Sequence, residues 1–151
     1  MTTLDDIDRK ILKQLAQDSQ THLSELSETV GLSTTALHHR IRRMKKEKII
    51  SRFSIILNPS AFGESMVCFV RVLKFKRSSV DLASKFKLIS EVEGCYSVTG
   101  EESLLLKIRV RTTIELQEVL ERLQKIDGVE RTLTSLVIEE HFDRGFSIAG
   151  K

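Results

Sequence analysis

The residues with the clearest chemical potential in this sequence are a run of cations between Thr34 and Lys48. Six of these fifteen residues are Arg or Lys, and Glu47 is the only acid among them. Guanidinium and ammonium groups bind phosphate, and an Arg can also pair with the edge of a guanine base. The alternative is that the run is the solvated face of an ordinary helix, so its phasing and its neighbours must decide between the two.

The run is predicted to lie on one helix that begins after Ser33, a favourable N-cap residue, and ends near Lys46. At about 100° per residue, Leu37, Ile41 and Met44 fall on one face and would pack inward. The opposite face is polar and cationic, with no acid three or four positions along the helix to offset the repulsion. A negatively charged partner would explain that arrangement.

Two predicted helices precede the cationic one. The first has apolar residues recurring every three or four positions and the capping-box pattern Thr3-x-x-Asp6 at its start. The second covers residues 22–30 and would end at Gly31, since glycine readily adopts the left-handed conformation that closes a helix. Two helices joined by such a turn form a helix-turn-helix, whose second helix lies in the major groove of DNA.

Position within this motif divides the cationic helix into two parts. Its N-terminal part would contact base edges, while Arg and Lys further along would bind backbone phosphates of double-stranded DNA. The candidates for base contact are Thr34, Thr35, His38 and His39. The full set of predicted DNA-binding residues is Ser33, Thr34, Thr35, His38, His39, Arg40, Arg42, Arg43, Lys45 and Lys46.

The composition fits one or two small globular domains. The chain has 151 residues and a net charge of +3, with 40% hydrophobic and 30% charged residues. Residues 1–39 carry three basic and six acidic side chains, but residues 40–52 carry seven basic and one acidic. No apolar run reaches the roughly 18 residues that a membrane helix needs, and no secretory signal opens the sequence, so we expect a cytoplasmic, nucleoid-associated protein. Cys68 and Cys95 are predicted to be buried thiols.

From position 53 the pattern changes to alternating strand and helix signals. Residues 53–57 are predicted to form a strand, and residues 58–65 a hinge around Pro59. Further strands are predicted at 66–75, 94–99, 104–111 and 129–140, and helices at 80–89 and 113–126.

The order β-α-β-β-α-β is the ferredoxin-like arrangement, a four-stranded antiparallel sheet with helices on one face. The predicted fold class is therefore α+β. It comprises a winged-type helix-turn-helix domain at 1–52, a connecting strand and hinge at 53–65, and a ferredoxin-like domain at 66–151. The other face of the sheet is apolar enough to require a cover, which predicts a homodimer.

Three segments carry a family resemblance through their order along the chain. They are an opening helix, LDDIDRKILKQLAQD (4–18), a helix-turn-helix, LSELSETVGLSTTALHHRIRRMKKEKII (23–50), and a connecting strand with hinge, FSIILNPSAFG (53–63). In this order the chain resembles the Lrp/AsnC, or feast/famine, family of transcription regulators over nearly its whole length. The resemblance implies a homodimer that presents two helices to a pseudo-palindromic operator and assembles to an octamer or another oligomer. It also implies that an amino acid or similar metabolite, bound between C-terminal domains, modulates assembly or DNA affinity.

The same resemblance implies an effector site. The family's loop after the second strand reads Thr/Ser-Gly-Asp/Glu-x-Asp, and its last strand begins with an Arg-Thr-x-Thr-like pattern. The matching residues here are Thr99, Gly100, Glu101, Glu102 and Ser103 in the loop, and Thr132, Thr134 and Ser135 in the strand. Hydroxyl and N–H groups would bind a carboxylate, and Glu101 or Glu102 an ammonium group. Ser103 replaces the family's aspartate and Glu102 its common aromatic residue, which indicates an unusual effector, or a plain polar turn with none.

Two other functions stay open at the level of sequence. An architectural protein could use the same helix without an effector, binding DNA with little discrimination and a steep salt dependence. The sirohaem decarboxylases resemble this two-domain architecture, although an enzyme has no need of an uncompensated basic helix. The four histidines offer no nucleophile–base pair or metal-ligand spacing, so no catalytic residue, metal or cofactor is predicted.

Overall fold

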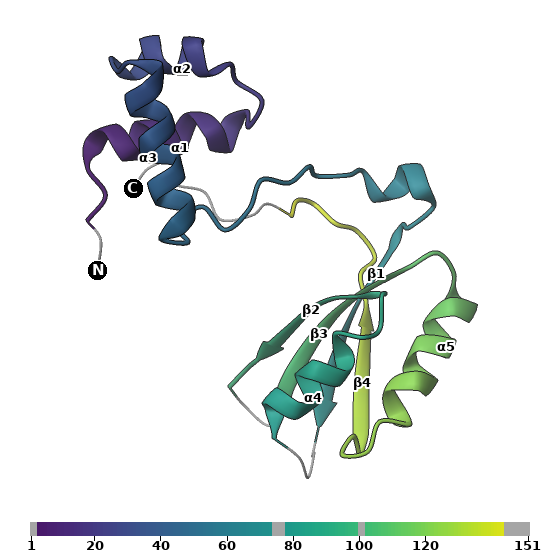
Figure 1. The fold of residues 1–151 in the computed structure, drawn as a ribbon. Helices are drawn as coiled ribbons and strands as arrows, with labels where there is room; N and C mark the ends of the chain where they lie inside the picture. Colours follow the sequence, from purple (N-terminus) through teal and green to yellow (C-terminus); the bar gives the residue numbers. More distant parts are fainter. Residues whose placement is uncertain (1–2, 74–77, 100–101, 144–151) are drawn as a thin grey trace. The chain divides into compact units, whose positions relative to one another are not determined.

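The computed structural model describes residues 3–73, 78–99 and 102–143. The chain divides into two compact units (Figure 1). One contains residues 3–56 with 142–143, and the other spans Leu57–His141. Among the described residues, no helix is long and apolar enough to cross a membrane.

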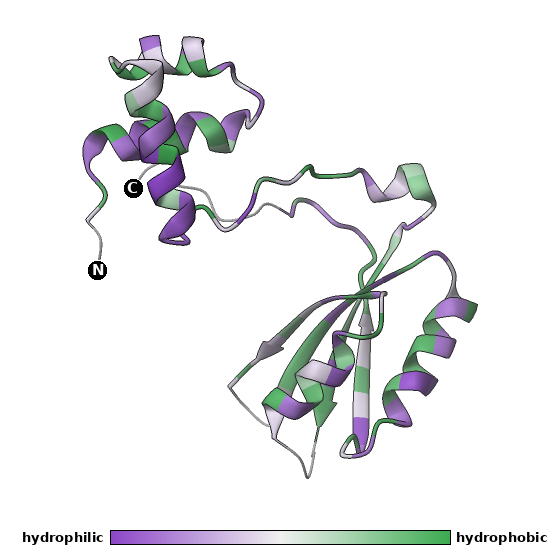
Figure 2. Cartoon of the chain, in the orientation of Figure 1, coloured by the Kyte–Doolittle hydropathy of each residue, from purple (hydrophilic) through white to green (hydrophobic). Residues whose placement is uncertain are grey.

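The first unit is a three-helix domain. Its helices are α1 (Asp6–Gln17), α2 (Leu23–Val30) and α3 (Thr34–Lys46). Their buried core consists of Ile11, Leu26, Leu37, Ile41 and Met44. The predicted inward face of α3 is therefore confirmed, and the C-terminal half of this helix is strongly hydrophilic on its other sides (Figure 2).

The helix ends follow from local hydrogen bonds. Gly31 is the C-cap of α2, and its φ of 69° is left-handed as predicted. Ser33 is the N-cap of α3, and its Oγ accepts a bond from the Ala36 N–H at 3.2 Å. The capping box of α1 is not the predicted Thr3–Asp6 pair. The Asp5 carboxylate accepts from the Asp8 N–H at 2.7 Å and the Asp8 carboxylate from the Asp5 N–H at 3.4 Å, so the box lies two residues later.

The predicted strand at 53–57 is wrong for the single chain. These residues are assigned to no strand and pair with none of the described strands, which all belong to the sheet of the second unit. A short 3₁₀ helix, η1 (Pro59–Phe62), follows in the predicted hinge. Asn58 caps its start, and Gly63, with φ of 76°, closes it.

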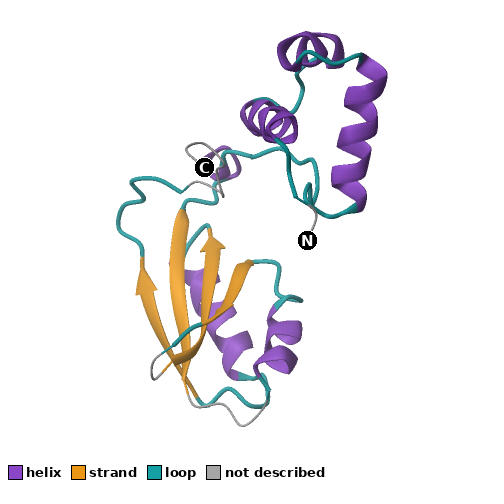
Figure 3. Cartoon of the chain, turned by 90° about the vertical axis from the view of Figure 1, so that its left-hand side faces the viewer, coloured by secondary structure: helices purple, strands orange, loops and turns teal. Residues whose placement is uncertain are grey.

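The second unit has the predicted β-α-β-β-α-β order, and its helices lie on one side of the sheet (Figure 3). Its elements are β1 (Met66–Leu73), α4 (Ser79–Phe86), β2 (Val92–Ser97), β3 (Glu102–Val110), α5 (Thr113–Gln124) and β4 (Arg131–Leu136). All pairings are antiparallel and the strand order is β2-β3-β1-β4. α4 and α5 cover one face of the sheet, where Cys68, Val70, Leu106, Phe86 and Leu123 belong to one buried core (Figure 1).

The strand register separates the two faces of the sheet. Leu105 pairs with Arg71 and Tyr96, and Phe69 pairs with Ser135, so these side chains point away from the helices. Phe69 and Tyr96 are exposed in the single chain, at 36% and 53%. β4 ends at Leu136, earlier than predicted, although the Val137 N–H still donates to the Val67 carbonyl of β1 at 2.9 Å.

Candidate nucleic-acid interface

The outer face of α3 carries most of the residues predicted to contact DNA. Seven of them are exposed: Thr34, Thr35, His38, His39, Arg42, Lys45 and Lys46. Ser33 is also exposed, but its hydroxyl oxygen is engaged as the N-cap. The buried residues of the helix lie at every third or fourth position, so packing against the other two helices leaves this face free.

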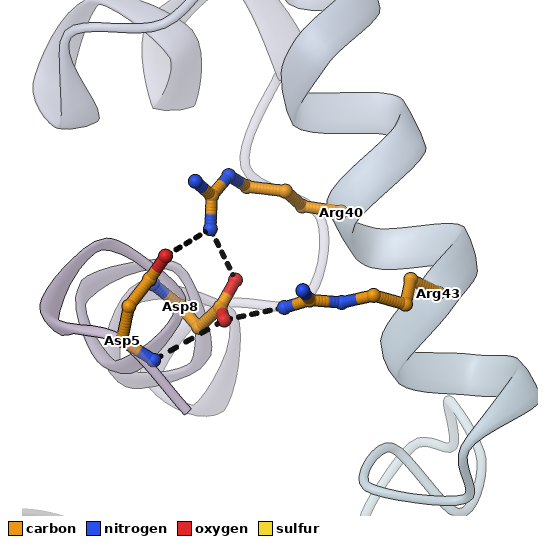
Figure 4. Close-up of polar contacts among 4 residues, drawn as sticks. All are labelled: Asp5, Asp8, Arg40 and Arg43. Atoms are coloured by element: carbon orange, nitrogen blue, oxygen red, sulfur yellow. Dashed lines mark hydrogen bonds and ion pairs between the residues drawn. The ribbon is translucent and has the colours of Figure 1, made fainter. Parts of the chain in front are cut away.

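Arg40 and Arg43 have a different role from the other cations (Figure 4). Arg40 Nη1 lies 2.6 Å from Asp5 Oδ2 and 2.9 Å from Asp8 Oδ1, and Arg43 Nη2 lies 2.5 Å from Asp8 Oδ2. The Asp8 side chain is only 1% exposed, whereas those of Arg40 and Arg43 are 25% and 34% exposed. Both arginines were predicted as phosphate contacts, but in this structure they hold α3 against α1.

The same contacts shift two titrations in the directions expected for ion pairs. The pKa of Asp5 is lowered by the hydrogen bond from the Asp8 backbone N–H and then by the bond from Arg40. The pKa of Arg40 is raised by its bonds to Asp5 and Asp8. The expected cationic repulsion is therefore partly offset by acids of α1. The sequence of α3 alone does not reveal this, because the acids lie more than 30 positions away, at the start of α1.

The remaining cations divide into two groups. The Lys45 ammonium nitrogen lies 4.6 Å from the centroid of the Phe53 ring, a cation–π distance that partly engages it. In the described part of the chain, neither Arg42 nor Lys46 pairs with an acidic side chain. Arg42 and Lys46 are thus the cations with the clearest freedom to bind an anion.

The predicted effector residues lie in the second unit. Thr99 is exposed, Gly100 and Glu101 lie outside the described residues, and β3 begins with Glu102 and Ser103. Leu73 of β1 pairs with Glu102 of β3 on one side and with Arg131 of β4 on the other. The starts of β3 and β4 therefore lie at the same end of the sheet, about 10 Å apart, with β1 between them.

The three predicted hydroxyl residues do not share a face. Thr132 pairs with Val72 and Thr134 with Val70, so both point to the helix side of the sheet. Ser135 pairs with Phe69 and points to the opposite side. Thr132 and Thr134 can act together within one chain, but Ser135 cannot join them.

The described residues contain no candidate metal site and no activated thiol. Among them no three His, Cys, Asp or Glu side chains are grouped in a way that could hold a metal ion. Cys68 is buried and Cys95 half-buried, and burial raises the pKa of both thiols, which favours the unreactive protonated form at neutral pH.

Comparison with known proteins agrees with this geometry. Residues 4–45 match the AsnC-type helix-turn-helix domain, and residues 67–145 match the Lrp/AsnC ligand binding domain. The chain belongs to the Lrp/AsnC family. It is therefore an α+β, helix-turn-helix regulator of transcription, and the match to the first domain contains α1, α2 and nearly all of α3.

Relatives match this Lrp/AsnC chain over almost their whole length. The HTH-type transcriptional regulator LrpA of Mycobacterium tuberculosis is 36% identical over 140 residues, covering 92% of this chain and 93% of the relative. The regulator FL11 of Pyrococcus furiosus is 33% identical over 138 residues, 91% of each chain. A structure of the feast or famine regulatory protein of M. tuberculosis complexed with L-methionine superposes with a TM-score of 0.89 at 34% identity. The match covers 97% of this chain and 99% of that protein.

Proposed function

We propose that this Lrp/AsnC regulator recognises specific DNA sequences with α3 as its recognition helix. The observation that carries the proposal is the exposed outer face of α3, where Thr35, His39, Arg42 and Lys46 stand free on a helix that begins immediately after the Gly31–Ser33 turn. Such a helix can place its N-terminal residues on base edges and its cations on phosphates. The protein acts as a DNA-binding switch in the cytoplasm, at the nucleoid, and not as an enzyme.

The proposed division of labour follows the chain. Residues 1–52 bind DNA, residues 53–65 connect, and residues 66–151 assemble and bind the effector. The open face of the sheet, with the exposed Phe69 and Tyr96, supports assembly through this domain, since water-exposed aromatic side chains on one face favour a covering partner. A two-fold dimer presents two copies of α3 to a pseudo-palindromic operator, and dimers assemble further, to an octamer or another oligomer.

An amino acid or similar metabolite is the proposed effector. The support is that a relative 34% identical to this chain forms a complex with L-methionine. The hairpin 99–103 and the residues Thr132 and Thr134 form the candidate site at one end of the sheet, and Ser135, on the other face, would contribute only from a neighbouring chain. A ligand that favours one assembly would change the affinity for the operator. By linkage, the operator would then change the affinity for the ligand by the same free energy.

Selection of bound duplexes from a random library tests the DNA proposal. We expect the wild-type protein to enrich one pseudo-palindromic sequence. His39→Ala should change the base preference by about 1–3 kcal/mol at the position it contacts, as removal of a good base-reading side chain would. Enrichment of no sequence by the wild type, with uniform binding at low salt, would contradict the proposal and favour an architectural protein.

Calorimetry against the amino acids tests the effector proposal. At least one should bind the wild-type protein, and Thr134→Val and Glu101→Ala should abolish the heat. Ser135→Ala is the informative comparison, because its side chain lies on the other face of the sheet from Thr134. The absence of heat with every amino acid would contradict an amino-acid effector.

A further inference from the structure

A nearly buried carboxylate of α1 connects two arginines of the recognition helix. Asp8 is 1% exposed, and its two oxygens accept hydrogen bonds from different partners, Arg40 at 2.9 Å and Arg43 at 2.5 Å. Arg40 and Arg43 lie three residues apart, which is almost one turn of α3, so one carboxylate holds two successive turns (Figure 4). Asp5 adds a second carboxylate on Arg40 at 2.6 Å.

These hydrogen bonds fix the orientation of α3, which the apolar core alone does not fix. Leu37, Ile41 and Met44 are buried, but apolar contacts are not directional and would permit α3 to roll or slide against its neighbours by small amounts. Hydrogen bonds between ions have narrow distance and angle preferences, and a buried carboxylate is costly unless its partners stay in place. The Asp8 contacts therefore fix the rotation of α3 about its own axis.

The same bonds also withdraw positive charge from the outer face. The Arg43 side chain lies back against the domain, and its Nε is buried without a hydrogen-bond partner in the described part of the chain. Arg40 is turned to two acids at once. Of the cations on α3, these two are neutralised within the domain, while Arg42 and Lys46 face outward.

We propose that Asp8 is a positioning residue for DNA recognition: it sets the orientation of the base-reading face of α3 and keeps Arg40 and Arg43 from binding phosphate. The inference rests on the proposed function, because it assigns to Asp8 a share of the sequence discrimination of α3. It makes an unusual prediction, since removal of an acid should strengthen non-specific DNA binding and weaken specificity together.

Asp8→Asn is the variant that separates this role from a merely structural one. It keeps the shape of the side chain but releases the two arginines. Each arginine that reaches a phosphate should steepen the plot of log affinity against log salt concentration by about 0.9, so up to about 1.8 per chain. The ratio of specific to non-specific affinity should fall about tenfold as the base-reading side chains move out of alignment. A domain that was only destabilised would bind more weakly and would not gain salt dependence.

The experiment uses the full chain and two duplexes, one selected from a random library by the wild-type protein and one of the same composition with its sequence scrambled. Affinities are measured from 50 to 200 mM KCl. Asp6→Asn is the matched control, since it removes one negative charge from the first turn of the same helix but does not contact either arginine among the described residues. It should leave the slope and the ratio near the wild-type values.

Two further variants keep the test decisive. If circular dichroism shows that Asp8→Asn is unfolded, Asp5→Asn replaces it, because Asp5 is half-exposed and its carboxylate pairs with Arg40 and not with Arg43. A steepening of at most about 0.9 is then expected. Adding Arg40→Gln and Arg43→Gln to Asp8→Asn should restore the wild-type slope but not the specificity ratio.

The possible results have distinct meanings. A steeper slope and a lower ratio in Asp8→Asn, absent from Asp6→Asn, support the inference. If the wild type discriminates between the duplexes but the folded Asp8→Asn protein keeps its slope and ratio, Asp8 is not a positioning residue and the inference is overturned alone. If the wild type itself fails to discriminate, the proposed function and the inference are both overturned.

Discussion

The end of α3 provides a test of the structure at a single residue. Among the described residues, Lys48 is the only non-glycine with a positive φ, at 57°. Its N–H donates to the Lys45 carbonyl at 3.1 Å, and the Ile49 N–H donates to the Met44 carbonyl at 2.9 Å. These two bonds form a Schellman motif, in which the left-handed position is most often glycine.

The expected gain from Lys48→Gly follows from two opposing terms. A side chain in the left-handed conformation costs roughly 1–2 kcal/mol, which glycine removes. Glycine has more freedom in the unfolded chain, and this offsets roughly 0.4–1 kcal/mol of the gain. We therefore expect a net stabilisation of the first unit by about 0.5–1 kcal/mol, or a rise of roughly 2–8 °C in Tm for a domain of this size.

Thermal and urea unfolding followed by circular dichroism measure the effect. Lys48→Ala is the matched control, since it removes the same charge but keeps the Cβ and its strain, so its stability should stay near that of the wild type. Glu47→Gly, at a neighbouring position with φ of −83°, should destabilise by about 0.5–1 kcal/mol. If Lys48→Gly is no more stable than Lys48→Ala, the assignment of backbone strain to this position is refuted.

Three other predictions concern packing, acid stability and the effector. Leu37→Ala, in the fully buried core of the first unit, should lower the free energy of unfolding by about 3–5 kcal/mol, which is comparable with the whole stability of so small a domain. This variant should therefore lose DNA binding, whereas Leu82→Ala, in the core of the second unit, should keep it. Full DNA affinity in Leu37→Ala would contradict this prediction. The lowered pKa of Asp5 means that its carboxylate stabilises the folded state above the unfolded pKa near 3.9, and that this contribution disappears as the pH falls through the folded pKa. Asp5→Asn should therefore lose less stability than the wild type between pH 5 and pH 2, and equal losses would count against the Asp5–Arg40 contact. Thr132→Val should weaken the binding of whichever amino acid gives heat by about tenfold, through removal of one hydrogen bond to a charged group. A similar loss in Ser135→Ala would mean that Ser135 acts from a neighbouring chain, because it lies on the other face of the sheet from Thr132. Unchanged binding in Thr132→Val would contradict the candidate site.

The elements of both units could be predicted from the sequence because their signals are local. Leu37, Ile41 and Met44 show the helical period that buries them, and Gly31 and Ser33 mark the turn before α3 by their backbone and capping preferences. The β-α-β-β-α-β order followed from alternating periods in the same way. These properties depend on neighbours in sequence, and no knowledge of the fold is needed to evaluate them.

Features that depend on contacts between elements could not be predicted in this way. The ion pairs of Arg40 and Arg43 are one of them, because their partners Asp5 and Asp8 lie more than 30 positions away, at the start of another helix. Residues 53–57 have the composition of a strand, but a strand requires a neighbour that only the fold can supply. The separation of Ser135 from Thr134 depends on where β4 begins its register with β1. Contacts across elements decide each of these features.

The salt dependence of DNA binding by two single variants tests the central claim most directly. That claim is that α3 binds DNA with Arg42 facing the phosphates while Arg40 is held by Asp5 and Asp8. On a duplex selected by the wild-type protein, Arg42→Ala should flatten the plot of log affinity against log salt by about 0.9 for each phosphate that the arginine neutralises in the wild type. Arg40→Ala should leave the slope unchanged. Equal flattening by both variants, or none by Arg42→Ala, would contradict the account.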